Sequence, residues 1–452
     1  MTSRTRHPPL APLTRDDVIR LDRAHVWHPY TPVDAWEKTD PIVVARAEGS
    51  SLYDADGTRY IDGNASWWVA GLGHGHPRLL RALREQAETL AHCALAGIAH
   101  EPSSALAAEL VRVAPRGLTR VFYTDDGSTS VEVAVKIALQ TWQHLGAPKK
   151  TRFVALDGAF HGDTLGASSL GGVEVFRRPF ASVLFDCVRA PFPDPNAYER
   201  AFEAIRDIIL REKDSIAAVV VEPLLQGAAG MRTYDAQYLR ALRDLTRDHD
   251  VLLVADEVFT GYGRTGAMWA CDHAGITPDL MCLGKTFSAI VPMGATLATD
   301  RVYDAFRGGG KDRALWYGHT FCGNPIGAAL AREVLAIYED EAVVAQASAK
   351  APRITAAFER IKAIPGVARV RSLGMIGAAD LEARAGSSGG SGTSYLGELG
   401  WRVYEEARRR GAYLRPLGDT VYVCPPLVIG DQDLGDLLQI LEESVQAALS
   451  SR

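Results

Sequence analysis

The residues that could do chemistry are polar side chains that directly follow short, continuously apolar runs. Such runs are typical of buried strands, and a parallel sheet binds its ligands at the carboxyl ends of its strands. We therefore expect the side chains at these positions to meet at one edge of a sheet. They are Glu222 after residues 217–221, Asp256 and Glu257 after 251–255, and Lys285 after 280–283.

A further apolar run, residues 120–123, is followed by the Gly/Ser/Thr-rich turn 124–130 and by a helical pattern over 131–142. The first N–H groups of a helix have no partner within the helix and attract anions, typically phosphate. Taken singly, this turn is better explained as an ordinary helix cap. Each carboxylate could likewise be a capping group, and Lys285 a side chain that extends to solvent.

Together these features match the groups of pyridoxal 5′-phosphate (PLP). This cofactor carries an aldehyde that bonds to a lysine, a ring nitrogen that an acid keeps protonated, and a phosphate that a helix N-terminus binds. The joint presence of the lysine, the upstream carboxylates and the phosphate-type turn is far more specific than any one of them. It predicts a PLP-binding enzyme.

Competing motifs are incomplete. Gly284, Lys285 and Thr286 resemble the end of a nucleotide-binding P-loop, but Asp279 stands where that motif needs a glycine. Residues 261–266 spell GxGxxG, yet they follow the acidic pair and precede no long helix, so we do not expect a dinucleotide site. No HExxH and no CxxC occurs, which argues against a zinc site, and the six cysteines are expected to be reduced thiols.

Periodicity predicts the elements that would position these residues. From about residue 79 to 300, helix-length amphipathic stretches alternate with the apolar runs. This alternation indicates an α/β fold with a mostly parallel sheet covered by helices on both faces. Residues 43–62 predict a small antiparallel meander. Residues 351–452 mix helical and strand patterns, so we expect a smaller α+β domain built from both termini.

The chain divides into five predicted parts, without an internal repeat. A low-complexity stretch at 386–394 is expected to be a mobile surface loop. The parts are a loose arm at 1–15, an N-terminal segment at 16–75 that packs with the small domain, a large PLP-binding domain at 76–325, a connecting helix at 326–350 and a small C-terminal domain at 351–452.

Composition limits the possible partners. The 452 residues include 49 Lys+Arg and 55 Asp+Glu, for a net charge of -6, and 47% are hydrophobic. Because no basic block occurs, we expect no nucleic-acid or anionic-membrane partner. No apolar run approaches the ~18–20 residues of a membrane helix, and no signal peptide is evident, which predicts a cytoplasmic protein. Small-molecule substrates are the expected partners.

Several motifs resemble a known family, and the resemblance covers nearly the whole chain. VLLVADEVFTGYGRTG at 251–266, DLMCLGK at 279–285 and HTFCGNP at 319–325 are similar to the class III PLP aminotransferases of fold type I. Three further stretches resemble one branch of that class, the 7,8-diaminopelargonic acid synthases of biotin biosynthesis. They are HVWHPYTP at 25–32, DGNASWWVAGLGHGHP at 62–77 and LRPLGDTVYVCPP at 414–426.

The resemblance implies a role for each matching cofactor residue. Lys285 would hold PLP and move the proton, Asp256 would pair with the ring nitrogen, and Gly127 with Ser128 would bind the phosphate. Thr320 would reach the phosphate of the neighbouring subunit's cofactor, which implies a homodimer with shared active sites.

The substrate residues follow from the same resemblance. Arg415 would bind the carboxylate of the keto substrate, for which its planar two-donor fork is suited. Tyr30, Trp67 and Trp68 would line the substrate channel, and Gly318 would contact substrate. Without the resemblance, core or surface packing would explain the aromatic residues, and a structural ion pair would explain Arg415.

The sequence departs from the synthases at two positions near the amino-donor pocket. Phe160 stands where they usually have Tyr; it can stack on the cofactor ring but cannot donate a hydrogen bond to substrate. His319, also expected near the cofactor, stands where members that use S-adenosylmethionine usually have Pro. One branch of the family uses lysine and has a Gly-His there, but it lacks the WHPYT and paired-Trp signatures.

The resemblance implies transamination of 8-amino-7-oxononanoate to 7,8-diaminononanoate, with S-adenosylmethionine as the expected donor. Three alternatives remain open. They are the same reaction with lysine as donor, another class III ω-amino acid or diamine aminotransferase, and a non-catalytic or nucleotide-binding protein that has kept the scaffold.

Overall fold

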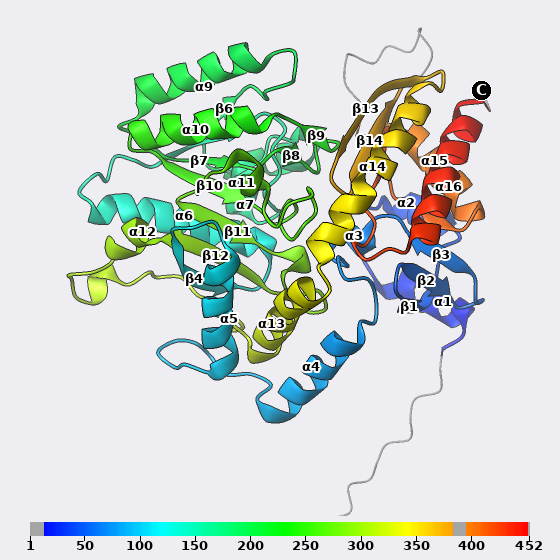
Figure 1. The fold of residues 1–452 in the computed structure, drawn as a ribbon, viewed down its shortest axis with the longest axis horizontal. Helices are drawn as coiled ribbons and strands as arrows, with labels where there is room; N and C mark the ends of the chain where they lie inside the picture. The colour runs from blue at the N-terminus through cyan, green and yellow to red at the C-terminus, as the bar shows by residue number, and fades with distance from the viewer. Residues whose placement is uncertain (1–12, 383–394, 451–452) are drawn as a thin grey trace, which may run out of the picture.

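The computed structural model describes residues 13–382 and 395–450. The low-complexity stretch 386–394 and most of the predicted N-terminal arm lie outside these residues. In the described part, a seven-stranded sheet flanked by helices lies beside a smaller α+β region (Figure 1). The predicted α/β architecture is confirmed. None of the described helices is long and apolar enough to cross a membrane.

The large sheet has the strand order β4-β12-β11-β10-β7-β5-β6. Strand β12 runs antiparallel to both its neighbours, and the other pairs are parallel. Every residue of β7, β10 and β11 is buried, which explains why these runs are apolar throughout. The strands are β4 (Leu118–Thr124), β5 (Arg152–Leu156), β6 (Cys187–Ala190), β7 (Ile216–Val221), β10 (Leu252–Asp256), β11 (Leu280–Leu283) and β12 (Gly294–Thr299).

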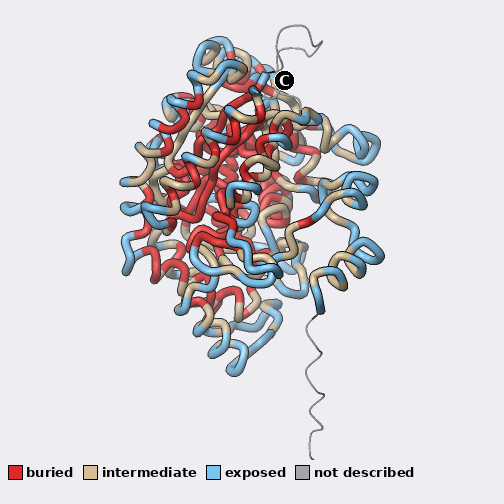
Figure 2. The backbone as a smooth tube through the Cα atoms, turned by 90° about the vertical axis from the view of Figure 1, so that its right-hand side faces the viewer, coloured by how far each residue is buried: buried red, intermediate tan, exposed pale blue. Residues whose placement is uncertain are grey.

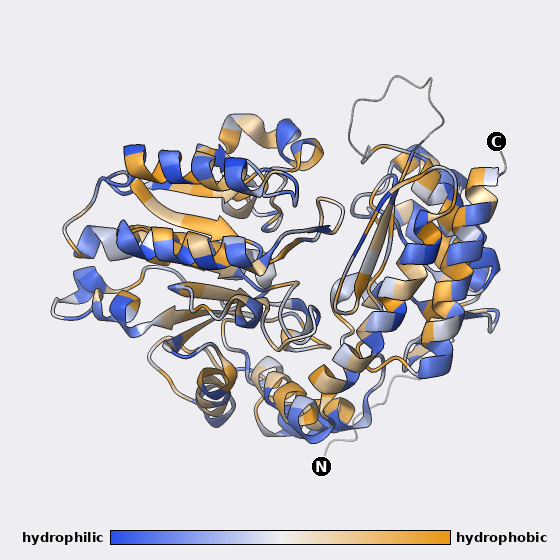
Figure 3. Cartoon of the chain, turned by 45° about the horizontal axis from the view of Figure 1, so that its top comes forward, coloured by the Kyte–Doolittle hydropathy of each residue, from blue (hydrophilic) through white to orange (hydrophobic). Residues whose placement is uncertain are grey.

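Alternate residues of these strands enter two different hydrophobic cores. In β10, Leu253 and Ala255 pack with the core that contains α9 and α10, whereas Leu252 and Val254 pack with the core that contains α6. The central strands are therefore apolar and the covering helices are polar on their outer surfaces (Figure 3). The helices of this region are α5 (Glu101–Val113), α6 (Gly127–His144), α7 (Leu165–Leu170), α8 (Glu174–Arg177), α9 (Tyr198–Glu212), α10 (Ala236–Asp248), α11 (Ala270–Ala274) and α12 (Asp300–Asp304).

The smaller region joins the two ends of the chain, as predicted. Strands β1 (Val44–Glu48), β2 (Ser51–Asp54) and β3 (Arg59–Asp62) form the antiparallel meander, and β15 (Ala412–Tyr413) pairs with β3 in parallel. A second antiparallel sheet contains the strands β13 (Val367–Leu373), β14 (Ile376–Leu381) and β16 (Thr420–Val423). Helices α14 (Val343–Lys362), α15 (Leu399–Arg409) and α16 (Asp431–Ser450) pack around these strands. Figure 2 shows buried residues within this region and exposed ones on its outer helices.

The remaining elements connect the two regions or lie at their edges. Helix α13 begins the predicted connecting segment 326–350, and α14 continues it from Val343 after a break at 341–342. These elements are α1 (Arg15–His25), α2 (Val33–Lys38), α3 (Ala65–Trp68), α4 (Pro77–Thr89), α13 (Pro325–Asp340), the hairpin β8 (Leu225–Gln226) with β9 (Arg232–Thr233), and the 3-10 turns η1 (Arg178–Val183), η2 (Lys285–Phe287) and η3 (Lys311–Arg313).

Glu257, one of the predicted strand-end acids, caps a helix. Its carboxylate accepts hydrogen bonds from the backbone N–H of Ala270 (3.1 Å) and Cys271 (2.8 Å) at the start of α11, and from the hydroxyl of Thr260 (2.6 Å). The side chain is almost wholly buried. Burial raises the pKa of Glu257 to about 7, although these hydrogen bonds favour the charged form.

This buried acid should make stability depend on pH. Folded Glu257 keeps its proton up to about pH 7, whereas an unfolded glutamic acid loses it near 4.5. Between these values the native state binds more protons, so its stability should fall as pH rises and level off above 7. The loss amounts to about 3 kcal/mol, at about 1.4 kcal/mol per pKa unit.

Glu257→Gln should remove this part of the pH dependence. The measurement is the difference in unfolding free energy between pH 5 and pH 8, by chemical denaturation. The exposed Glu359→Gln serves as the control and should behave like the wild type. A Glu257→Gln variant with an unchanged difference would contradict the assignment.

Candidate active site

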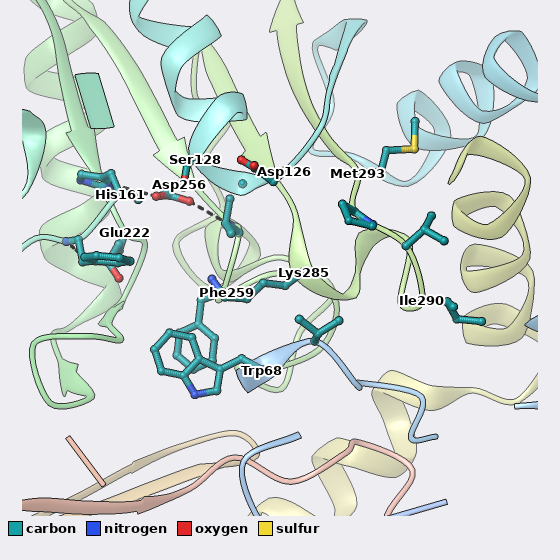
Figure 4. A pocket seen from close by; sticks show the side chains of 17 residues that line it. Trp68, Asp126, Ser128, His161, Glu222, Asp256, Phe259, Lys285, Ile290 and Met293 are labelled. Atoms are coloured by element: carbon teal, nitrogen blue, oxygen red, sulfur yellow. Dashed lines mark hydrogen bonds and ion pairs between the residues drawn. The ribbon is translucent and has the colours of Figure 1, made fainter. Parts of the chain in front are cut away.

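A cavity of about 380 Å³ opens at the carboxyl ends of β10 and β11 (Figure 4). It brings together the side chains of Glu222, Asp256 and Lys285 with the first residues of α6, Gly127 and Ser128. Of the strand-end side chains predicted to meet, these three do, whereas Glu257 is outside the cavity lining and caps α11. The other lining residues are Trp68, Val69, Asp126, Phe160, His161, Gly162, Val258, Phe259, Ile290, Val291, Pro292 and Met293.

Lys285 points its amine into this cavity. The residue begins η2 directly after β11, and its backbone is left-handed, with φ of 52°. Its Nζ lies 5.1 Å from the centre of the Trp68 ring and 5.8 Å from that of Phe259. Burial lowers the pKa of Lys285, although the charges of Asp256 and Glu222 oppose this effect. A larger fraction of the amine is therefore uncharged and nucleophilic at neutral pH.

Asp256 is held by a histidine that the sequence analysis did not single out. Oδ2 of Asp256 lies 2.7 Å from Nδ1 of His161, and Oδ1 accepts the backbone N–H of Val258 at 3.1 Å. Both side chains are buried. The imidazole therefore fixes the direction of the carboxylate, and Figure 4 shows this pair on the side of the cavity opposite Trp68.

Glu222 is a second buried carboxyl group beside this pair. It accepts backbone N–H groups from Phe160 (3.0 Å) and Gly227 (2.9 Å). Burial raises its pKa to about 7, and the charge of Asp256 adds to that rise, while His161 and the two N–H groups oppose it. Glu222 thus fixes the backbone that carries Phe160 into the cavity.

The start of α6 forms a part of the cavity wall that is suited to bind an anion. Asp126 caps the helix by accepting the N–H of Thr129 at 2.8 Å, so the N–H groups of Gly127 and Ser128 are left for a ligand. Gly162, with φ of 124°, closes over this helix start, and a Cβ there would overlap Ser128 Oγ. An amine, a buried carboxylate and a helix N-terminus line one cavity, and this set of groups fits PLP.

Residues Ala65 to Trp68 form a left-handed turn at the cavity floor. Four consecutive non-glycine residues have positive φ values of 46°, 45°, 64° and 73°. Such a conformation costs roughly 1–2 kcal/mol per residue, so it persists only where surrounding contacts enforce it. Trp68 packs against Phe259 with ring centres 4.3 Å apart, and its Nε1 donates to the hydroxyl of Tyr422 at 3.0 Å.

The turn sends the neighbouring Trp67 to a rim outside the residues that line the cavity, together with Tyr30 and Arg415. Its ring lies 5.6 Å from that of Tyr30 and 5.8 Å from the guanidinium carbon of Arg415. One guanidinium nitrogen of Arg415 donates to the backbone oxygen of Tyr30 at 3.3 Å. The hydroxyl of Tyr30 donates to Asp163 at 2.5 Å. The predicted substrate residues Tyr30, Trp67 and Arg415 are therefore in contact.

The loop that contains Gly318, His319 and Thr320 lies away from the cavity lining of this chain. Nδ1 of His319 lies 2.9 Å from Oδ2 of Asp125, and Gly318 and Thr320 are exposed. The single chain thus leaves these predicted contact residues free to face a neighbouring subunit, and their roles stay predictions.

The sequence analysis missed part of the aromatic lining. His161 lies beyond the residues that directly follow β5, which ends at Leu156, so the rule that identified Asp256 does not reach it. The same holds for Phe176 and Tyr395. The Phe176 ring lies 5.7 Å from Phe160, 5.2 Å from Tyr30 and 4.8 Å from Tyr395. It therefore links the wall of the cavity to its rim.

Known proteins are similar to this chain in both sequence and architecture. An adenosylmethionine-8-amino-7-oxononanoate aminotransferase from Geobacter sulfurreducens is 39% identical over 437 residues, which cover 94% of this chain and 96% of that protein. One from Synechococcus elongatus is 41% identical over 421 residues, covering 91% and 96%.

Solved structures of aminotransferases have the same fold as this chain. A crystal structure of adenosylmethionine-8-amino-7-oxononanoate aminotransferase from Methanocaldococcus jannaschii matches with a TM-score of 0.91 at 32% identity, covering 95% of this chain and 98% of that one. An omega transaminase from Pseudomonas jessenii in complex with PMP has a TM-score of 0.89 at 29% identity, covering 96% and 98%. The family model described as aminotransferase class-III matches residues 33–445. The chain therefore belongs to the class III aminotransferases.

Proposed function

We propose that this aminotransferase uses PLP to convert 8-amino-7-oxononanoate to 7,8-diaminononanoate, the reaction of biotin biosynthesis, with S-adenosylmethionine as amino donor. The observation that carries the proposal is the turn 65–68, which places one tryptophan beside Lys285 and the next beside Arg415. The site thus has an amine at one end and a guanidinium at the other, with aromatic rings between them. The names of the relatives support the same substrate.

The residues that would hold the cofactor are Lys285, Asp256, Gly127 and Ser128, with Phe160 against its ring. When bound, PLP supplies an electron sink for the carbon that loses its proton during amino transfer. The lowered pKa of Lys285 suits its Nζ to take up and return that proton. Asp256, oriented by His161, supplies the negative charge that would face the ring nitrogen.

The other side chains would orient the acceptor and exclude water. Trp68 and Phe259 cover the floor beneath Lys285, so the proton transfer takes place away from bulk solvent. The long apolar chain of the keto acid would lie along Trp67, and its carboxylate would meet Arg415 in a charge-assisted pair.

Replacing the guanidinium tests the acceptor. Arg415→Ala should lower kcat/KM for 8-amino-7-oxononanoate roughly 10- to 100-fold, mainly through KM, because a hydrogen bond to a charged group contributes about 1.5–3 kcal/mol. Steady-state kinetics would measure this. Arg410→Ala, which removes a guanidinium bound to Glu406 on α15, should leave both constants unchanged.

A second candidate function is a class III ω-amino acid or diamine aminotransferase with another acceptor. The similarity to omega transaminases at a TM-score of 0.89 favours it. An Arg415→Ala enzyme with unchanged kinetics on the biotin precursor, together with good activity on simple ketones, would replace the first proposal with this one.

The identity of the amino donor can be tested in the first half-reaction alone, without the keto acceptor. Phe160 keeps an aromatic wall in the cavity, and His319 is bound to Asp125 outside the cavity lining, so neither departure removes a wall or adds a charge to the cavity. We expect S-adenosylmethionine alone, and not lysine, to discharge the yellow absorbance of the PLP-loaded protein. Absorbance titration with each donor measures this.

Two further results would decide the donor. Phe160→Tyr, which restores the hydroxyl usual in the synthases, should respond to S-adenosylmethionine at least as well as the wild type. Conversion by lysine alone would contradict the proposed donor, and conversion by neither would point to the second candidate function.

We also propose that two chains form a homodimer. Large apolar side chains near Thr320 are exposed to solvent, among them Trp316 (71%), Phe321 (57%) and Ile98 (53%). Such a patch is typical of a protein interface. A second copy placed on it would cover these residues and bring Thr320 toward the neighbouring cofactor site.

A charge within this patch should break the dimer. Phe321→Glu would place a carboxylate in the apolar interface, where its desolvation is costly. We expect a monomer by light scattering and a loss of activity of at least 10-fold, because each site would lose the partner's Thr320. Leu210→Glu, an equal change at an exposed position of α9, should remain dimeric. A dimeric, active Phe321→Glu protein would rule out this interface.

A further inference from the structure

The left-handed turn at 65–68 is held by a buried carboxylate, Asp62. This residue ends β3 and is wholly shielded from solvent. Its Oδ2 accepts the hydroxyl of Ser66 at 2.9 Å and lies 2.9 Å from Nε2 of His74, and its Oδ1 accepts the backbone N–H of Asn64 at 3.3 Å. Asp62 therefore contacts the turn itself, the residue before it and the segment after it.

These contacts act on a backbone that would otherwise relax. Ser66, with φ of 45° and ψ of 58°, lies in the middle of a conformation that L-amino acids avoid. In this conformation its hydroxyl donates to Asp62 at 2.9 Å, which helps to hold the residue there. The turn is also tied to the C-terminal segment, because Oδ1 of Asn64 accepts the backbone N–H of Arg415 at 2.6 Å.

The handedness of the turn decides where the two tryptophans point. Trp68 is buried beside Lys285, and Trp67, the next residue, is exposed at the rim beside Arg415. If Ser66 moved to another backbone conformation, Trp67 would leave its place between Tyr30 and Arg415. The aromatic surface beside the guanidinium therefore depends on this turn.

We propose that Asp62, acting through Ser66, is a positioning residue that holds Trp67 beside Arg415 and so favours long-chain keto acids as acceptors. This inference rests on the proposed function. Asp62 holds the strained turn in place. A displaced turn would weaken the binding of the acceptor, whose carboxylate meets Arg415.

Ser66→Gly separates the positioning role from a merely structural one. Glycine adopts positive φ without strain, so the change relieves the backbone while it removes the bond to Asp62. We expect the melting temperature to stay the same or rise, while KM for 8-amino-7-oxononanoate rises about 10-fold and kcat changes less than 2-fold. Binding of the acceptor, measured by isothermal titration calorimetry, should weaken by the same factor.

Two further variants complete the test. Asp62→Asn weakens the hold on the turn and should raise the acceptor KM in the same way. Asp279→Asn is the matched control. It alters an equally buried carboxylate, paired with Arg243 at 2.6 Å and remote from the cavity lining, and should lower the melting temperature without changing KM.

The possible outcomes distinguish a failure of this inference from a failure of the proposed function on which it rests. A wild-type enzyme that does not aminate 8-amino-7-oxononanoate refutes the proposed function and the inference with it. A wild-type enzyme that does so, with Ser66→Gly melting lower at an unchanged KM, refutes the inference alone. Ser66→Asn, which tolerates the left-handed conformation and keeps a donor, should restore KM to within about 3-fold of the wild type.

Discussion

The pairing of β3 with β15 is the constraint on which the active site depends. Ile61 and Asp62 lie beside Ala412 and Tyr413, and the strand contact continues through the backbone bond from Gly63 N–H to Tyr413 O at 3.0 Å. Segments 350 residues apart are thereby brought into register just before each reaches the site. One continues into the tryptophan turn and the other into Arg415. The contacts among Tyr30, Trp67 and Arg415 therefore form only when the two ends of the chain are folded together, whereas the large sheet supplies the lysine and the acids by itself.

Similar acids at strand ends of the large sheet have different roles, because their neighbours differ. Asp256 faces the imidazole of His161 inside the cavity, with Oδ2 2.7 Å from Nδ1. Glu222 and Glu257 receive backbone N–H groups instead, and burial raises the pKa of each to about 7. Glu222 fixes the loop that carries Phe160, and Glu257 begins α11. The position of an acid after a buried strand therefore indicates the edge of the sheet at which it lies, and its hydrogen-bond donors determine whether it serves the reaction or the scaffold.

The sequence predicts those features of the structure that depend on neighbouring residues, and it does not predict those that depend on distant ones. The runs that became β7, β10 and β11 were predicted from their apolar character alone, and Lys285, Asp256 and Gly127 follow from their places after such runs. The antiparallel direction of β12 cannot be predicted from the hydrophobic pattern of its own residues. The same holds for the bond from Trp68 to Tyr422, which joins residues from opposite ends of the chain. The left-handed turn is also not predictable, because it contains no glycine, and the contacts that enforce it come from Asp62 and the C-terminal segment.

The two departures from the synthase pattern, which the sequence groups together, are separate in the structure. Phe160 lines the cavity, and its ring reaches the rim through Phe176, which contacts Tyr30. A missing hydroxyl there makes this part of the cavity wall less polar. His319 instead ties its loop to Asp125, which directly precedes the residue that caps α6. This contact therefore fixes the loop that is proposed to meet the neighbouring subunit. Of the two, only Phe160 lines the cavity of its own chain, so the departure that changes the cavity itself is an apolar ring in place of a phenol.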